Sequence, residues 1–379
     1  MKCRFTVLLS CILFTFFFTG CQNQSASQTD SAAAEEVSAL PATEEAAASE
    51  PIDEPIAESS TVEEAEHELP PVKLPAAEYR LTIKYSSELL KNAVDGSNPD
   101  KTLNIYLPAS YYDSEKRYPV IYFFHGFGGT PYTFYNDWQA FAQYMQADPD
   151  KEFVVVEVDG RTVRDNGSFY VNSEVTGPWE DYVTAEIVPF VDQNYRTIAD
   201  ASSRGTAGFS MGGFASINLA FRHPDIFSSA QAICPGLLKD EDLSVALDSW
   251  SSSPAFLNSY GRAFAPDPES ESLCIIPVLD DSAEDDAMCE KWLDGFGHLD
   301  QKISDYLALN KPLNKIQIIY GTQDPYSWIP EGTEYFSGLL EENGFDDAMI
   351  ELQMGHTIPE DYIGTYFVPF FSSSLNFNE

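Results

Sequence analysis

The chain has 379 residues, 44% of them hydrophobic and 13% aromatic, which is enough apolar material for a large buried core. Acidic residues outnumber basic residues by 60 to 21, so the formal net charge at pH 7 is −39. A charge of that sign and size repels polyanions. It therefore argues against nucleic acid or an anionic membrane surface as a partner, and favours a small neutral substrate.

The first twenty residues have the pattern of an export signal. Lys2 and Arg4 precede an apolar run over residues 5–18, which is too short for a convincing membrane-spanning helix. The following Gly20-Cys21 resembles the cleavage site of bacterial lipoproteins, with an ordinary secretory signal as the alternative. We expect residues 1–20 to be a signal peptide and Cys21 to carry lipid. The protein would then be anchored at the extracellular face of the bacterial cell membrane through that lipid alone.

Residues 21–75 are predicted to form a disordered acidic linker. They are rich in Ala, Ser, Glu and Pro and contain almost no aromatic residues, so they cannot bury enough apolar surface to offset the entropy of ordering. Repulsion between their carboxylates extends such a segment. The linker would hold the folded domain, residues 76–379, away from the cell surface.

The folded domain begins with alternating patterns over residues 79–85 and 103–108, which predict an antiparallel pair of strands. Apolar runs over 120–124, 152–158 and 316–320 predict strands buried on both faces. Helical patterns alternate with them at 138–145, 180–191, 211–221, 332–342 and 361–371. This alternation predicts an α/β fold with a mostly parallel, doubly wound sheet and helices on both faces.

The stretch over residues 236–313 has no regular pattern and is expected to be an irregular lid or binding insertion. Three cysteines remain once the signal and the lipid anchor are set aside. This odd count permits one disulfide, for which Cys274 and Cys289 are the candidates because they are close in sequence. Cys234 ends an apolar run and is expected to be a buried free thiol.

Gly208-Phe209-Ser210-Met211-Gly212 indicates a nucleophile elbow. A strand that turns into a helix within a few residues forces the serine into sparsely populated backbone angles, so its neighbours must lack a Cβ. Such a turn exposes the Ser210 hydroxyl at a helix N-terminus, where N–H groups face a developing negative charge. A flexible loop of the same composition is the alternative.

An activated serine needs a base, and the chain has only five histidines. His67 lies in the linker, His125 begins a glycine-rich loop, and His223 ends the helix that follows the elbow. His356 follows a strand-like run and precedes the last helix, which is where open α/β sheets place catalytic groups. We therefore predict His356 as the base, with His298 in the insertion as its competitor.

The acid that orients the base is expected after a strand, between the serine and the histidine. Asp324 in Gly321-Thr-Gln-Asp324 meets both conditions. Asp280 is the alternative, although Pro277 weakens the preceding run as a central strand.

Two backbone N–H groups are predicted to form the oxyanion hole. One belongs to Met211, directly after the nucleophile, and the other to Phe127 in the loop His125-Gly126-Phe127-Gly128-Gly129. That loop lacks the pattern of a phosphate-binding or dinucleotide-binding motif. No His/Cys/Asp cluster has metal-ligand spacing, and we expect neither a cofactor nor a metal.

Several motifs occur in the order found in one branch of the α/β-hydrolases. They include Tyr118-Pro-Val120, His125-Gly-Phe-Gly-Gly129, Gly167-Ser-Phe-Tyr170, Trp179-Glu180, Gly208-Phe-Ser-Met-Gly-Gly213, His223-Pro-Asp225, Gly321-Thr-Gln-Asp324 and Gly355-His356. From Tyr79 to the C-terminus the chain resembles the esterase D or putative esterase branch, which includes feruloyl and acetyl-xylan esterases. The resemblance implies an α/β-hydrolase fold with Ser210 as nucleophile, Asp324 as acid and His356 as base. It also implies that Tyr170 and Trp179 border the cleft and stack on a sugar or aromatic acid, with core packing as the alternative.

The expected function is that of a lipid-anchored serine esterase acting on a small or carbohydrate-borne carboxylic ester. An acyltransferase with the same serine chemistry is one alternative. A surface binding protein without catalysis is another.

Overall fold

The computed structural model describes residues 73–163, 166–280, 282–345 and 349–378. The predicted signal peptide, Cys21 and nearly all of the predicted linker lie outside these described residues. Among the residues described, none of the helices is both long enough and apolar enough to cross a bilayer.

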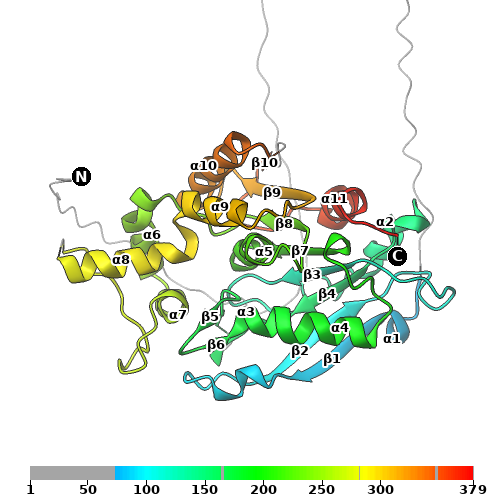
Figure 1. The fold of residues 1–379 in the computed structure, drawn as a ribbon, viewed down its shortest axis with the longest axis horizontal. Coiled ribbons are helices and arrows are strands. Elements are labelled where there is room, and N and C mark those ends of the chain that lie inside the picture. Colours follow the sequence, from blue (N-terminus) through cyan, green and yellow to red (C-terminus); the bar gives the residue numbers. More distant parts are fainter. Residues whose placement is uncertain (1–72, 164–165, 281, 346–348, 379) are drawn as a thin grey trace, which may run out of the picture. The chain divides into compact units, whose positions relative to one another are not determined.

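Within this part of the chain, an eight-stranded sheet forms the centre of the domain (Figure 1), with strand order β1-β2-β4-β3-β7-β8-β9-β10. The strands are β1 (Arg80–Ser86), β2 (Asp100–Tyr106), β3 (Val120–Phe124), β4 (Val154–Val158), β7 (Arg204–Phe209), β8 (Ser229–Ile233), β9 (Lys315–Gly321) and β10 (Met349–Leu352). β2 pairs antiparallel with β1 and β4, and all other pairs are parallel. The predicted antiparallel pair and the mostly parallel sheet are confirmed.

The helices alternate with these strands. They are α1 (Ala76–Tyr79), α2 (Gln139–Met145), α3 (Trp179–Asp181), α4 (Val188–Asn194), α5 (Met211–Arg222), α6 (Leu243–Ser251), α7 (Pro254–Phe264), α8 (Ala283–Phe296), α9 (Leu299–Ala308), α10 (Trp328–Glu342) and α11 (Val368–Ser374). π-helical segments over Tyr182–Ile187 and Ile363–Phe367 lead into α4 and α11. A two-stranded ribbon, β5 (Asn172–Ser173) and β6 (Gly177–Pro178), lies apart from the main sheet.

Strand β7 shows that helices cover both faces of the sheet. Successive side chains on a strand point to opposite faces. A Cβ on Gly205 would lie 2.5 Å from the Phe371 ring of α11, whereas a Cβ on Gly208 would lie 2.1 Å from the Gly212 carbonyl oxygen of α5. Because these glycines are three residues apart, α11 and α5 cover opposite faces, as a doubly wound sheet requires.

The insertion over residues 236–313 is helical, so the expectation of an irregular segment is wrong. It forms α6, α7, α8 and α9, of which α6 to α8 gather at one end of the domain beyond α5 (Figure 1). Residues that favour a helix N-terminus stand at the start of two of these helices. Pro254 occupies the first turn of α7, and the Ser282 hydroxyl accepts a hydrogen bond from the Asp285 N–H at the start of α8. The helices have only 9 to 14 residues each, which hides their periodicity.

Aromatic packing holds the insertion together. The Trp250 ring of α6 lies 4.7 Å from Tyr260 of α7 and 6.2 Å from Trp292 of α8, measured between centroids. Tyr260 also donates a hydrogen bond to the Trp292 carbonyl oxygen and accepts one from the Phe296 N–H, each at 2.8 Å. These rings are buried, so the insertion has a core of its own.

The cysteines of the described residues are free thiols, so the expected Cys274–Cys289 disulfide is wrong. The Cys274 sulfur faces Asn258 at 3.9 Å, and the Cys289 sulfur faces Asp285 at the same distance. The two thiols therefore contact different groups. Cys234 is a buried free thiol, as expected.

We expect Gly208→Ala to destabilise the domain by about 3 kcal/mol or more, because the added Cβ would overlap backbone atoms of α5 that cannot rotate away. Gly338→Ala in α10 is the matched control. Nothing lies within 4 Å of its added Cβ, and replacing a helical glycine should stabilise by about 0.5–1 kcal/mol. Chemical denaturation measures both. Equal unfolding midpoints for Gly208→Ala and the unmodified chain would contradict the close approach.

Candidate active site

Ser210 lies in the sharp turn between β7 and α5. Its backbone has φ +56° and ψ −116°, a conformation that a residue with a Cβ adopts only under strain. Its N–H donates to the Ile233 carbonyl oxygen at 2.8 Å, and its carbonyl oxygen accepts from the Phe214 N–H at 2.9 Å. A Cβ on Gly212 would lie 1.9 Å from the Phe124 carbonyl oxygen. Glycine is thus required where α5 passes over β3.

The structure brings together the three residues predicted for catalysis. The Ser210 hydroxyl oxygen lies 2.9 Å from Nε2 of His356, and Nδ1 of His356 lies 2.6 Å from Oδ2 of Asp324. An ionised carboxylate only accepts hydrogen bonds, so Nδ1 carries the proton and Nε2 is free to accept one from the serine. We call the hydrogen-bonded series Ser210, His356 and Asp324 the relay. It has the geometry of a nucleophile, its base and an orienting acid.

Each member of the relay follows a parallel strand at the same edge of the sheet. Ser210 follows β7, Asp324 follows β9 and His356 follows β10, and carboxyl ends of parallel strands meet at one edge. The two later loops are joined, because the Thr322 and Gln323 N–H groups donate to the Leu352 and Met354 carbonyl oxygens at 2.9 and 3.0 Å.

The Asp324 carboxylate is held on both oxygens. Its Oδ1 accepts from the Tyr326 N–H at 2.9 Å while Oδ2 faces His356. The side chain has no exposed surface, and that of His356 is 17% exposed. The rings of Phe209 and Tyr326 lie 5.0 and 5.4 Å from the imidazole, measured between centroids, and restrict its orientation.

The competing residues lie elsewhere. His298 faces Asp294, Glu290 and Asp240 on the insertion. His223 bonds Glu180 at 2.8 Å. Asp280 is exposed, and its Oδ1 accepts a hydrogen bond from the nearby Ser282 N–H.

The residues predicted for the oxyanion hole flank Ser210. Met211 is the first residue of α5, so its N–H has no partner within the helix. Phe127 follows β3 and lines the same cavity as Ser210 and His356. The assignment of these two N–H groups to an oxyanion hole stays a prediction.

His125 supports the loop that carries Phe127. The Gly160 N–H donates to its Nε2 at 3.1 Å, so Nδ1 carries the proton and faces the Gly126 carbonyl oxygen at 2.8 Å. Burial lowers the pKa of His125 to about 4. The imidazole is therefore neutral at pH 7 and fixes the backbone of the loop.

The assignment of Tyr170 and Trp179 to substrate binding is wrong, because both side chains are fully buried. The Tyr170 hydroxyl accepts from the His125 N–H and donates to the Val158 carbonyl oxygen, each at 3.2 Å. The Trp179 indole N–H donates to the Thr176 carbonyl oxygen at 2.8 Å. Tyr170 therefore supports the His125 loop, and Trp179 packs in the core.

The sequence did not identify most of the side chains around Ser210. A cavity of about 210 Å³ opens beside its hydroxyl, and the insertion and α10 supply much of its wall. The aromatic residues that line it are Phe127, Phe209, Trp250, Phe256, Phe296, Tyr326 and Trp328. The density of aromatic residues in the insertion was the available signal, but only packing shows which of them face the serine.

Cys234, Asp324 and His356 also come close enough together to be considered as metal ligands, since one possible ligand atom of each lies within 4.8 Å of the others. The donor chemistry does not fit. Both ring nitrogens of His356 are engaged by Ser210 and Asp324, and burial raises the pKa of Cys234 to about 12, which keeps the thiol protonated. Metals bind the thiolate.

Comparison with known proteins finds similar esterases. Residues 96–264 match the family described as "Putative esterase". The chain is 36% identical over 141 residues to an esterase of Mycobacterium tuberculosis, Rv1288, an alignment that covers 36% of this chain and 29% of the relative. The domain has the α/β-hydrolase fold, and residues 96–264 are similar to the esterase family.

Other relatives of this α/β-hydrolase extend the comparison. It is 29% identical over 150 residues to an endo-1,4-beta-xylanase/feruloyl esterase of Xylanibacter ruminicola, covering 38% of this chain and 20% of the relative. These alignments span less than a third of each curated relative. Among solved structures, a ferulic acid esterase has a TM-score of 0.52 at 18% identity, covering 78% of this chain and 97% of the other. A fluorophosphonate-binding serine hydrolase of Staphylococcus aureus has a TM-score of 0.50 at 18% identity, covering 78% and 98%. These two share the fold.

We expect Asp324→Asn to slow the reaction of Ser210 with a fluorophosphonate by about a thousandfold or more, because the amide can donate to Nδ1 and favour the wrong tautomer of His356. Asp280→Asn is the control and should react at the unmodified rate. The rate of labelling, followed by mass spectrometry, measures both. The reverse pattern would assign the acid to Asp280.

We expect the stability advantage of the unmodified α/β-hydrolase over His125→Gln to shrink as the pH falls from 6.5 to 4. The pKa of His125 is about 4 in the folded state and near 6.5 when unfolded. Between these two values the unfolded chain binds more protons at this residue than the folded chain does. The folding stability therefore decreases as the pH decreases. Chemical denaturation of both chains at several pH values gives the difference. A difference that stays constant from pH 7 to pH 4 would contradict a buried neutral imidazole.

Proposed function

We propose that this chain is a serine esterase that hydrolyses small carboxylic esters through an acyl-enzyme on Ser210. The observation that carries the proposal is the hydrogen-bonded relay from Ser210 through His356 to Asp324, which opens on an aromatic cavity of about 210 Å³. The match of residues 96–264 to the esterase family supports the reaction class.

In the first half of the reaction, the Ser210 oxygen attacks the ester carbonyl carbon and its proton passes to Nε2 of His356. The carbonyl π bond becomes an oxyanion, which the N–H groups of Met211 and Phe127 stabilise. Losing one such donor typically costs roughly 3 kcal/mol of transition-state stabilisation. Asp324 stabilises the imidazolium. The tetrahedral intermediate then collapses, the bond to the alcohol breaks, and His356 returns its proton to the departing oxygen.

In the second half, water attacks the acyl-enzyme. His356 takes a proton from the water as its oxygen bonds to the acyl carbon, and gives it to the Ser210 oxygen as that bond breaks. The products are a carboxylic acid and the free enzyme. Every proton transfer uses groups of the relay.

The substrate we propose is an acyl decoration on carbohydrate, of the acetyl or feruloyl type. The aromatic residues around Ser210, including Trp250 and Phe256, favour an apolar acyl group. A relative of the chain is named as a xylanase and feruloyl esterase. The chain would act outside the cell, held by lipid on Cys21, since residues 1–21 have the pattern of a bacterial lipoprotein signal.

We expect Ser210→Ala to abolish hydrolysis of acetyl, butyryl and feruloyl esters of a chromogenic alcohol, because the acyl-enzyme cannot form. The unmodified chain should hydrolyse at least one of them. Tyr132→Phe, on the exposed surface outside the cavity, is the control and should retain full activity. Undiminished hydrolysis by Ser210→Ala would refute the mechanism.

A second readout separates hydrolysis from acyl transfer. Adding a free sugar to the assay should leave the carboxylic acid as the main product. If most of the acyl group moved to the sugar, the chain would be an acyltransferase with the same nucleophile. Failure of the unmodified chain to react with a fluorophosphonate would instead favour a binding protein.

A further inference from the structure

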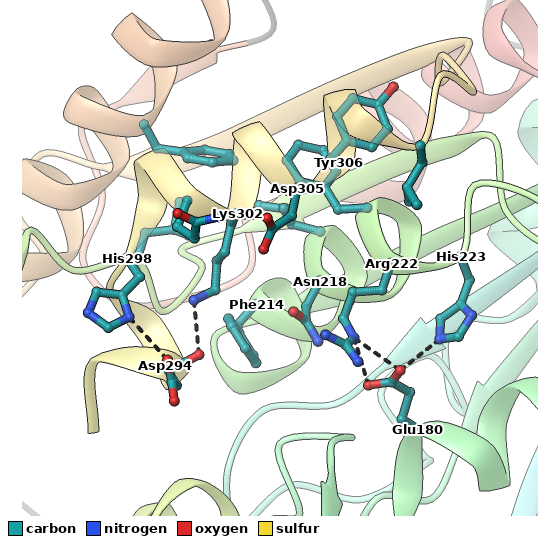
Figure 2. Close-up of a pocket in the computed structure, with 16 residues that line it drawn as sticks. Glu180, Phe214, Asn218, Arg222, His223, Asp294, His298, Lys302, Asp305 and Tyr306 are labelled. Carbon is teal, nitrogen blue, oxygen red and sulfur yellow. Dashed lines mark hydrogen bonds and ion pairs between the residues drawn. The ribbon is translucent and has the colours of Figure 1, made fainter. Parts of the chain in front are cut away.

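A larger cavity, of about 550 Å³, lies between α5 and α9 and does not include Ser210, His356 or Asp324. Its volume is within the range of small-molecule sites, roughly 300–1,000 Å³. Residues 214, 217, 218, 221 and 222 form one continuous face of α5 along it. Gln301, Lys302, Asp305 and Tyr306 of α9 lie opposite. Figure 2 shows Asn218 and Arg222 on one side and Lys302 and Asp305 on the other, directed toward the same space.

Both apolar and polar side chains line this cavity. Of the apolar ones, Phe214, Phe221, Leu237 and Phe336 are buried. The Asn218 amide takes part in no hydrogen bond among the described residues and is partly exposed to the cavity. It offers both a donor and an acceptor to a ligand.

The charged groups of the cavity are already organised. Arg222 donates through Nε to both oxygens of Glu180 at 3.0 Å, and Lys302 donates through Nζ to the Asp294 carbonyl oxygen at 2.9 Å (Figure 2). The Lys302 Nζ also donates to the Gly297 carbonyl oxygen at 2.6 Å. The Arg222 side chain is 60% exposed. These pairs hold the cations in place while leaving N–H groups free for a ligand.

The balance of charge argues against an anionic ligand. Three carboxylates line the cavity, those of Glu180, Asp294 and Asp305, against the two cations Arg222 and Lys302. Burial also lowers the pKa of Lys302 to about 8, which weakens it as an anchor for an anion. The carboxylates and the net charge of −39 repel anions. Interspersed donors and carboxylate acceptors suit hydroxyl groups, each of which can donate and accept.

The cavity is elongated. A smaller hollow of about 210 Å³ continues from it and shares Glu180, Phe214, Asn218, Arg222 and Asp294 with it. That hollow reaches Asn172 and residues 263–264 at the end of α7. A ligand that follows both parts is therefore longer than one sugar ring.

A single aromatic layer separates this cavity from the cavity at Ser210. Phe214 lines the larger cavity, Phe296 lines the one at Ser210, and their ring centroids lie 5.0 Å apart. The adjacent residues Gly236 and Leu237 likewise line one cavity each. The two cavities are therefore neighbours with separate walls.

We propose that the cavity between α5 and α9 is an accessory binding site for a neutral oligosaccharide, which holds the carbohydrate chain of an acylated substrate beside the catalytic cavity. The role in catalysis rests on the proposed function, whereas binding of the oligosaccharide does not. An accessory site raises the local concentration of acyl groups carried on the same polymer. A small ester would not use it.

The first experiment measures binding to Ser210→Ala by calorimetry, with unacylated xylotetraose and cellotetraose as probes. We expect at least one to bind. Asn218→Ala and Asp305→Ala, each made in the Ser210→Ala chain, should weaken binding about fivefold to tenfold through lost hydrogen bonds. Gln193→Ala, which removes an exposed amide on α4 outside the cavity, is the matched control and should bind as tightly as the parent. Alanine is favourable within a helix, so these variants should fold.

A second experiment compares two substrates on chains with Ser210 intact. Asn218→Ala should raise KM for acetylated xylan about threefold or more, and leave kcat and KM for a chromogenic acetate unchanged. If the unmodified chain did not hydrolyse the small ester, this result would count against the proposed function but not against the accessory site. The accessory site would be refuted if neither tetrasaccharide bound, or if binding persisted in Asn218→Ala and Asp305→Ala. It would also be refuted if acidic oligosaccharides bound and neutral ones did not.

Discussion

The close approach of three backbone segments at Ser210 is the constraint on which the site depends. β3, β7 and the start of α5 come so near one another that a Cβ on Gly208 or Gly212 would overlap carbonyl groups. That contact holds Ser210 at φ +56°, a conformation the residue would leave if the surrounding packing did not impose it. This backbone conformation directs the Ser210 hydroxyl out of the sheet at the N-terminus of α5. Core packing therefore stabilises the strained turn that presents the hydroxyl.

Parallel pairing then determines where the partners of Ser210 lie. β7, β8, β9 and β10 are paired in register, so the loops that follow β9 and β10 leave the sheet at the same edge as the elbow. Hydrogen bonds between these two loops set the spacing of Asp324 and His356. On the other side, the buried neutral imidazole of His125 and the hydroxyl of Tyr170 fix the loop that carries Phe127. The arrangement around Ser210 is thus supported by side chains that do not line the cavity beside it.

The helical insertion over residues 236–313 lines both of the cavities described above. Its aromatic core supplies Trp250, Phe256 and Phe296 to the cavity at Ser210, while its last helices, α8 and α9, form one wall of the larger cavity above α5. One element therefore shapes both hollows. Rings such as Phe296 belong both to the core of the insertion and to the wall of the cavity at Ser210, so the shape of that cavity follows from how the insertion folds.

The sequence by itself determined the features that are encoded locally. The glycine-serine-glycine spacing, the continuous apolar strands and the polar loops after them identified the elbow, the parallel sheet, Ser210, Asp324 and His356, because backbone sterics and burial leave a direct mark on residue order. Only the tertiary structure decided the roles of Tyr170 and Trp179, the free state of Cys274 and Cys289, and the helical form of residues 236–313. Those features depend on which distant groups pack together. An aromatic residue in a core and one in a cleft have the same local pattern, and only the completed packing distinguishes them.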